Sequence, residues 1–243
     1  MAAEHRQSTE ATNRATGWAM GCDRLINRLK WPTALLAMLT TPLLAWSTLR
    51  LLLRVALEPI SLLPFLAGTV LFIVLWRRWL GRSRVGRLAI TFEHEATHAM
   101  FAMLTGHRIV GFQASHGNGG QVRFTGSGNW LIVAAPYFFP TAALLLALLA
   151  LLLPFPSLPW QGFLLGVALG YHLVSTYRET HRDQTDIQHL GLTFCWLFLP
   201  AANLIVIGFL IAFAHSGSAG VSQWASDTLA PSASAIAWLK TLW

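Results

Sequence analysis

Residues 88–104 read LAITFEHEATHAMFAML, which places the charged motif His94-Glu95-Ala96-Thr97-His98 inside an apolar run. On a helix, two histidines four positions apart lie on one face, where both rings can hold the same metal ion. Glu95 lies one step further along, about 100° round the helix axis, where its carboxylate reaches a water molecule rather than the metal. The spacing therefore predicts a metal centre for hydrolysis, with His94 and His98 as ligands and Glu95 as general base.

Composition indicates that this motif belongs to a membrane protein. Of the 243 residues, 54% are hydrophobic and 11% are charged, with a mean hydropathy of +0.52, and such values are typical of membrane proteins. Ionisable groups at membrane depth cost roughly 2.5–3.5 kcal/mol each on insertion scales, so the histidines need a partner such as a metal. The net charge of +7 does not indicate nucleic-acid binding, because the basic residues lie beside apolar blocks and form no recognisable binding module.

Long apolar blocks set the expected fold. Each block is long enough, or nearly so, to cross a bilayer as a helix. We therefore predict an all-α polytopic membrane protein with about six transmembrane helices. The six blocks are Trp31–Leu49, Pro59–Trp76, Leu88–Leu104, Trp130–Leu153, Leu158–Tyr177 and Thr193–Ala214.

Basic residues predict the orientation and the division of the chain. Arginine and lysine are concentrated in residues 1–30 and again in residues 77–87, two predicted spans apart, and cytoplasmic segments carry such an excess. We interpret these arginines as orientation signals and not as phosphate ligands. The sequence thus predicts three parts. They are a cytoplasmic N-terminal tail over 1–30, a membrane-embedded core over 31–215 and a C-terminal tail, with at most a weak interfacial helix, over 216–243.

The segment 107–129, which follows the motif, is rich in glycine around the short alternating run QVRF. This pattern indicates either a β-hairpin, which could re-enter the membrane, or a flexible external loop. A hairpin would offer a strand edge for pairing with an unwound substrate. Gly119, Gly120 and Val122 are therefore candidate substrate-binding residues.

Three other polar residues have interpretations that a structure can test. Asn203, in the last apolar block, is a candidate for orienting substrate or for a hydrogen bond between helices. Glu93 points away from the histidine face, so we expect it to be solvated or paired with an arginine. His107 follows the motif block and is expected at a membrane interface.

A catalytic zinc site uses three protein ligands and keeps one position open, so a third ligand must come from outside the motif. The densest polar cluster elsewhere in the chain is residues 172–189. Asp186 lies there near the start of the last apolar block, and a carboxylate complements two imidazoles. Asp183 and His181 remain open as alternatives.

Taken together, these motifs resemble the M50 peptidases, the intramembrane zinc proteases related to site-2 protease, and especially their small bacterial M50B-like branch. The resemblance is carried by the HEATH motif, the glycine-rich segment, the run APYFFP over 135–140 and the run QTDI over 184–187. It implies one zinc ion per chain, held by His94, His98 and Asp186, with Glu95 as general base.

The chain also departs from the pattern of the family. Thr97 stands where glycine is common before the second histidine, Ile187 follows the aspartate where better-known branches carry glycine, and Pro200 precedes Asn203 instead of following it.

The resemblance implies a multi-pass protein of the bacterial inner membrane that cleaves membrane proteins with a transmembrane helix. Peptide bonds would be hydrolysed by a zinc-activated water with Glu95 as base. Two alternatives are a non-proteolytic scaffold for membrane partners and a metal or proton transporter. The intact Glu95 disfavours a scaffold, and the almost purely apolar second and fourth blocks disfavour a transport path. The sequence carries no indication of oligomeric state.

Overall fold

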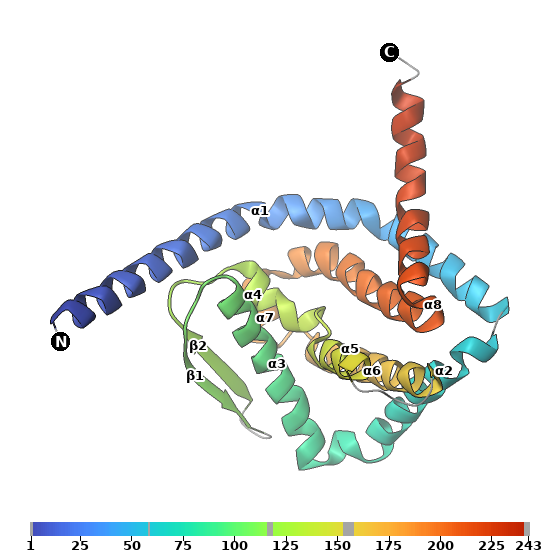
Figure 1. Ribbon diagram of the computed structural model, residues 1–243, viewed down its shortest axis with the longest axis horizontal. Helices are drawn as coiled ribbons and strands as arrows, with labels where there is room; N and C mark the ends of the chain where they lie inside the picture. Colours follow the sequence, from blue (N-terminus) through green and yellow to red (C-terminus); the bar gives the residue numbers. More distant parts are fainter. Residues whose placement is uncertain (1, 58, 116–118, 153–157, 241–243) are drawn as a thin grey trace.

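Figure 1 shows the computed structural model, which describes residues 2–57, 59–115, 119–152 and 158–240. Helices make up most of these residues, and a two-stranded antiparallel hairpin is the one sheet among them. The predicted all-α class is therefore confirmed. In chain order the elements are α1 (Ala2–Leu57), α2 (Pro59–Arg78), η1 (Leu80–Arg82), α3 (Arg84–Leu104), β1 (Ile109–Ala114), β2 (Gly120–Phe124), α4 (Trp130–Ala134), η2 (Ala135–Tyr137), α5 (Thr141–Leu152), α6 (Leu158–Glu179), α7 (Thr185–Leu190) and α8 (Leu192–Lys240).

Fewer helices than the sequence predicts combine the length and the hydropathy needed to cross a membrane. The described helices that are long and apolar enough to cross a membrane cover residues 17–57, 62–82 and 192–230. The count of about six spans is thus not confirmed. The predicted block Trp130–Leu153 is wrong as a single span, because its described residues, 130–152, form three short pieces, α4, η2 and α5. Pro136 lies in η2 and Pro140 immediately before α5, and proline interrupts a helix because it lacks an N–H.

The C-terminal segment forms a helix that continues α8 beyond a kink (Figure 1). Ser216 (φ −145°, ψ 23°) and Gly217 (φ 59°) leave helical geometry at this kink. Beyond it, Asp227 forms an ion pair with Arg54 of α1 at 2.6 Å. The predicted boundary at residue 215 therefore lies next to this kink, and α8 packs against α1.

Helices α2 and α6 cross in close contact because glycine stands where their backbones meet. A Cβ atom added to Gly166 would overlap the carbonyl oxygen of Phe65, and one added to Gly68 would overlap that of Phe163. Thr69 Oγ1 donates a hydrogen bond across the crossing to the Gly166 carbonyl at 3.0 Å. Small residues allow such close approach between helices in a membrane.

Substitution of Gly166 by alanine should therefore destabilise the protein. We expect the free energy of unfolding to fall by about 1–3 kcal/mol, the usual cost of overpacking a core. Gly162→Ala is the matched control on the same helix, because a Cβ there would meet Pro64 Cβ at an ordinary 3.8 Å. Equilibrium unfolding in mixed micelles measures both changes. Equal effects of the two substitutions would contradict a special role for the close backbone contact.

The glycine-rich segment forms a hairpin, as one of the two sequence interpretations predicts. β1 and β2 pair antiparallel, with Phe112 opposite Val122 and Ala114 opposite Gly120. The hairpin lies beside α3 at the edge of the molecule (Figure 1). Phe112 packs there against Phe92 of α3, with ring centroids 5.5 Å apart. The segment therefore lies along the helix that carries the motif.

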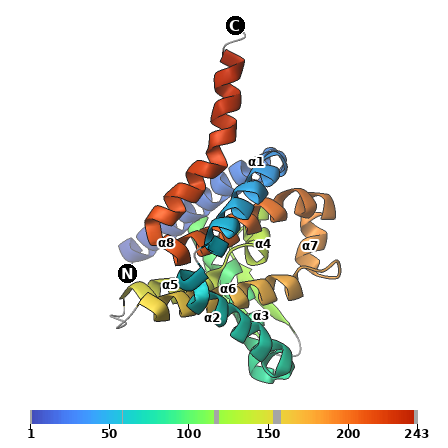
Figure 2. The ribbon, with the colours of Figure 1, turned by 90° about the vertical axis from the view of Figure 1, so that its right-hand side faces the viewer.

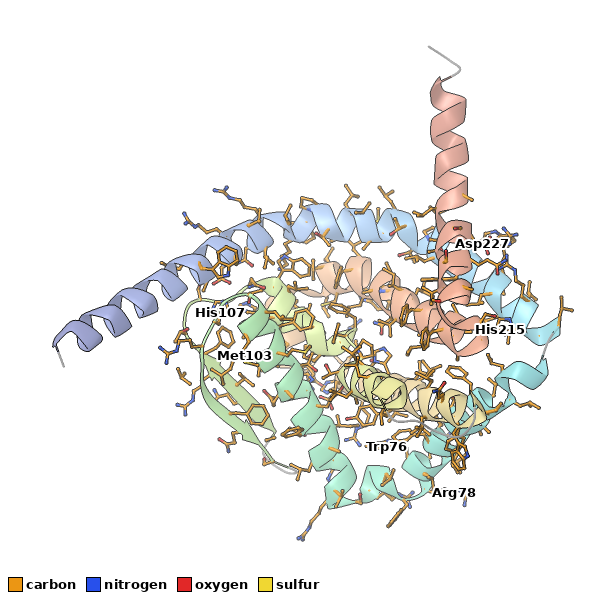
Figure 3. The ribbon with its side chains drawn as sticks, viewed as in Figure 1. Trp76, Arg78, Met103, His107, His215 and Asp227 are labelled. Atoms are coloured by element: carbon orange, nitrogen blue, oxygen red, sulfur yellow. The ribbon has the colours of Figure 1, made fainter. Side chains whose placement is uncertain are left out.

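The N-terminal helix holds both ends of the hairpin. Asp23 of α1 is 3% exposed and accepts hydrogen bonds from the Gly128 N–H at 3.1 Å and from Asn129 Nδ2 at 2.8 Å. His107, which lies between the end of α3 and α1 (Figure 3), brings its Nε2 within 3.0 Å of the same carboxylate. The His107 side chain is fully buried, and Asp23 supplies the partner that burial requires. Its position at a membrane interface stays a prediction.

A further contact joins α1 to the segment that follows α6. Lys30 Nζ donates a hydrogen bond to the carbonyl of Leu190, the last residue of α7, at 2.9 Å. Residues 23–30 thus contact two parts of the core, and the predicted boundary at residue 30 falls within a continuous helix.

Candidate metal centre

Three side chains from two helices converge at one point. His94 and His98 lie on the same face of α3, and Asp186 comes from the first turn of α7. Asp186 Oδ2 lies 3.3 Å from His94 Nε2 and 3.1 Å from His98 Nε2, and the two Nε2 atoms are 3.2 Å apart. The structure thus brings together the three residues that the resemblance implies as ligands, in a cluster able to hold a metal ion.

Local sequence accounts for the position of α3. Ser83 caps the helix, since its Oγ accepts a hydrogen bond from the Gly86 N–H at 2.9 Å, as serine commonly does at a helix start. The helix then runs unbroken to Leu104. The spacing of four residues therefore places His94 and His98 one above the other.

Asp186 reaches the histidines because the chain turns back after α6. Figure 2 shows α7 at the side of the molecule, on the connection between α6 and α8. The two alternative ligands lie in the preceding turn, away from the cluster. The Asp183 side chain is 98% exposed and the His181 side chain 50%, and the two lie 4.0 Å from each other. The geometry therefore favours Asp186 over both.

Two groups that the sequence did not single out orient the cluster. The hydroxyl of Tyr137, in η2, donates a hydrogen bond to Asp186 Oδ2 at 3.1 Å. The carbonyl oxygen of Ile132 lies 2.8 Å from His98 Nδ1, so Nδ1 carries a proton and donates. In a neutral ring this leaves the lone pair on Nε2, directed at the other two ligand atoms.

Glu179, the last residue of α6, lies on the far side of the His94 ring. Its Oε2 is 3.9 Å from His94 Nδ1, a buried nitrogen with no hydrogen-bond partner among the described residues. Gln184 Nε2 donates to the same carboxylate at 2.8 Å. A carboxylate on the outer nitrogen of a ligand histidine is the common arrangement around bound metals.

The chemistry of the donor set fits a divalent cation. Burial opposes ionisation of Asp186, but its contacts with His94 and His98 outweigh that effect, and its pKa lies below the ordinary value. An ionised carboxylate and two ring nitrogens that point at one another repel unless protons or a cation lie between them. Two imidazoles and one carboxylate are a ligand set typical of catalytic zinc.

A cavity of about 580 Å³ opens beside the cluster and includes Glu95 in its wall. No described residue donates a hydrogen bond to the Glu95 carboxylate, so both oxygens remain available to a molecule in the cavity. The predicted substrate-binding residues Gly119, Gly120 and Val122 all line this cavity. The fourth, Asn203, does not, and instead donates to the Tyr137 carbonyl at 3.0 Å and contacts His172 Nε2 at 3.2 Å.

Glu93 does not have the environment that the sequence suggested. Its carboxylate accepts hydrogen bonds from the Ala142 N–H at 3.2 Å and from Ser175 Oγ at 3.3 Å. Ala142 lies at the start of α5, where backbone N–H groups lack partners within the helix. The expectation of a solvated or arginine-paired Glu93 is therefore wrong, because this side chain joins α3 to the start of α5.

Comparison with known proteins concerns the same part of the chain. Residues 65–230 match the sequence profile of the family described as Peptidase M50B-like. The match covers well over half of the chain and includes α3, the hairpin and α7. Neither the search of curated proteins nor the search of solved structures gives a match.

Proposed function

This chain belongs to the M50B-like peptidase family, and from that premise we propose that it is an intramembrane zinc endopeptidase. Its substrates are membrane proteins with a transmembrane helix. The observation that carries the proposal is the meeting of His94, His98 and Asp186 next to a cavity that also contains Glu95. The three long apolar helices fit an integral membrane protein, with the N-terminus proposed to be cytoplasmic.

Each residue of the centre has a role in this proposal. His94, His98 and Asp186 hold one zinc ion, while Tyr137 and the Ile132 carbonyl fix the Asp186 and His98 side chains. A zinc ion bound there supplies Lewis acidity, which polarises a carbonyl and lowers the pKa of a water molecule. Outer hydrogen bonds of this kind keep ligands oriented and often change metal affinity by about 10- to 100-fold.

Glu95 performs the proton transfers. It takes a proton from the attacking water as the water adds to the scissile carbonyl, and then delivers that proton to the leaving amine. The carboxylate is suited to this role because its oxygens face the cavity without a competing donor from the described residues. Its neighbour Glu93 is already occupied by the Ala142 N–H.

The hairpin holds the substrate as an extended strand. A helix hides its backbone in internal hydrogen bonds, so a transmembrane substrate must unwind locally before its peptide bond can be attacked. β2 lies in the cavity wall through Gly120, Gln121, Val122 and Phe124. An unwound segment can pair with the free edge of a strand, which supplies backbone hydrogen bonds without requiring one sequence.

Proteoliposomes containing the purified protein and zinc test this function against transport. We expect cleavage of a co-reconstituted single-span protein, loss of cleavage after chelation and recovery after zinc is restored. A zinc-sensitive dye inside the vesicles reports flux in parallel. Zinc flux without cleavage would favour the transporter, and neither flux nor cleavage in zinc-loaded protein across several substrates would favour the scaffold.

Gly120→Ala should impair cleavage without removing the metal. An added Cβ would overlap Glu95 Cγ, so the carboxylate must move away from its place in the cavity. We expect the rate of cleavage to fall by about 10²-fold, within the range ascribed to a displaced general base, with zinc content unchanged. Gly111→Ala is the control on β1, since its Cβ would meet only the flexible end of Arg123. An active Gly120→Ala protein would contradict the close fit between β2 and Glu95.

A further inference from the structure

A separate cavity of about 580 Å³ lies between the end of α2, η1 and the last turns of α6. Three of its lining residues are arginines, namely Arg77 of α2, Arg82 of η1 and Arg178 of α6. They come from segments about 100 residues apart in the chain, so the fold and not the local sequence brings them together.

The arginines of this cavity have no acidic partners among the described residues. Arg54 forms an ion pair with Asp227 elsewhere, but no described carboxylate lies within salt-bridge distance of Arg77, Arg82 or Arg178. Glutamate and aspartate are absent from the whole segment 59–92. Unpaired positive charge gathered around one cavity favours an anionic ligand.

The Arg178 side chain is held in place at the cavity wall. Its guanidinium carbon lies 5.6 Å from the centroid of the Trp76 ring, a cation–π contact. Its Nη1 lies 3.5 Å from the Gly81 carbonyl. Trp76 is itself buried. Figure 3 shows Trp76 and Arg78 together at the C-terminal end of α2. A guanidinium fixed in this way is prepared to bind an anion with less loss of side-chain freedom.

The rest of the cavity is apolar and is continuous with a surface suited to lipid. Its other walls include Ile73, Leu173 and Val174. Along α2 the surface continues over exposed Val70 and Val74. The candidate membrane span that contains most of α2 runs from Leu62 to Arg82, so Arg77 and Arg82 lie at its end. The cavity therefore lies at the boundary between hydrocarbon and headgroups.

We propose that this cavity binds an anionic phospholipid, with the headgroup phosphate among Arg77, Arg82 and Arg178 and an acyl chain along Ile73 and the exposed face of α2. For Arg77 and Arg82 this proposal replaces the interpretation from sequence, which excluded a role as phosphate ligands. Basic pockets between helices on the cytoplasmic side commonly bind acidic headgroups. The next residue after Arg178 is Glu179, beside His94, so the lipid site and the metal centre share the end of α6.

Lipid retention measured by native mass spectrometry tests the site. The full-length protein is equilibrated in micelles with equal amounts of phosphatidylglycerol and phosphatidylcholine of identical acyl chains. We expect wild type to retain phosphatidylglycerol in preference. Each arginine-to-glutamine change should reduce its affinity by about fivefold, the contribution of one basic residue near an anionic surface. The variant Arg77→Gln/Arg82→Gln/Arg178→Gln should lose the preference.

A matched variant separates this site from the effect of net charge. Arg28→Gln/Arg50→Gln/Arg84→Gln removes the same charge from positions outside the cavity and should keep the lipid preference. Equal losses in the two triple variants would overturn the proposal, as would a wild type without preference. Millimolar inorganic phosphate distinguishes a lipid site from a free-anion site, because displacement of phosphatidylglycerol by phosphate alone would also overturn it. Metal loading plays no part in this readout, so it is independent of peptidase activity.

Discussion

Glu95→Gln should nearly abolish cleavage while the protein keeps its zinc. This result is expected because glutamine preserves the size of the side chain and its place in the cavity wall, but it cannot accept a proton from water. General bases contribute about 10²–10⁴-fold to such reactions, so the rate of peptide hydrolysis should fall by at least the lower of these factors. The ligand cluster does not include Glu95, so the metal content should not change.

The measurement pairs an activity assay on a reconstituted single-span substrate with zinc analysis of the same preparation. Glu93→Gln is the matched control, since it makes the same chemical change two residues earlier on α3. Its amide oxygen can still accept the Ala142 N–H that Glu93 accepts, so cleavage should remain within a few-fold of wild type.

Two outcomes would contradict the assignment of Glu95. Wild-type cleavage by the Glu95→Gln protein would mean that another group acts as base. Loss of zinc from that protein would mean that the carboxylate belongs to the ligand set. A third pattern, in which Glu93→Gln is as damaging as Glu95→Gln, would attribute both effects to disturbance of α3.

The part of the site that depends on local geometry could be predicted from sequence. A helix fixes the relation between His94 and His98 whatever surrounds it, and Ser83 starts that helix in the expected way. The hairpin could also be predicted as one of two interpretations, because glycines flank the alternating run QVRF over 121–124. Asp186 required the resemblance, since its side chain meets the histidines only through the turn after α6.

The remaining parts depend on contacts between distant segments. Tyr137 and Glu179 gain their roles from the way η2 and α6 pack against α3, and neither stands in a pattern of its own. The contact of His107 with Asp23 could not be predicted, because the two residues lie 84 positions apart in the chain. The periodicity of residues within one segment does not predict a contact between two distant segments.

The error over Trp130–Leu153 has a different cause. Hydropathy averaged along this block is high throughout, so it favours one long span. The two prolines at 136 and 140 carry the opposite signal, because a helix cannot keep its hydrogen bonds through them. The break places Tyr137 next to Asp186 and lets α5 begin at Thr141, beside Glu93. The interruption of the span thus brings Tyr137 to the metal centre and the start of α5 to Glu93.

Asp186→Asn should cost the protein most of its zinc. Asparagine keeps the shape of the side chain and can still accept the Tyr137 hydroxyl, but it removes the negative charge that balances the cation. Loss of an outer partner of a metal ligand already weakens binding by about 10- to 100-fold, and loss of a direct anionic ligand should weaken it by more. Competition with a chromogenic chelator measures the zinc affinity of the purified protein.

Asp183→Asn is the control for that change, because it removes the same charge three residues earlier in a side chain that is 98% exposed. Its zinc affinity should equal that of wild type. Bound zinc should also be lost from His94→Ala, which removes a ligand from α3 instead of α7. If Asp186→Asn kept its zinc while Asp183→Asn lost it, the third ligand would lie in the exposed turn. The convergence of α3 and α7 would then not be the metal-bound arrangement, since Asp183 reaches the histidines only if that turn refolds.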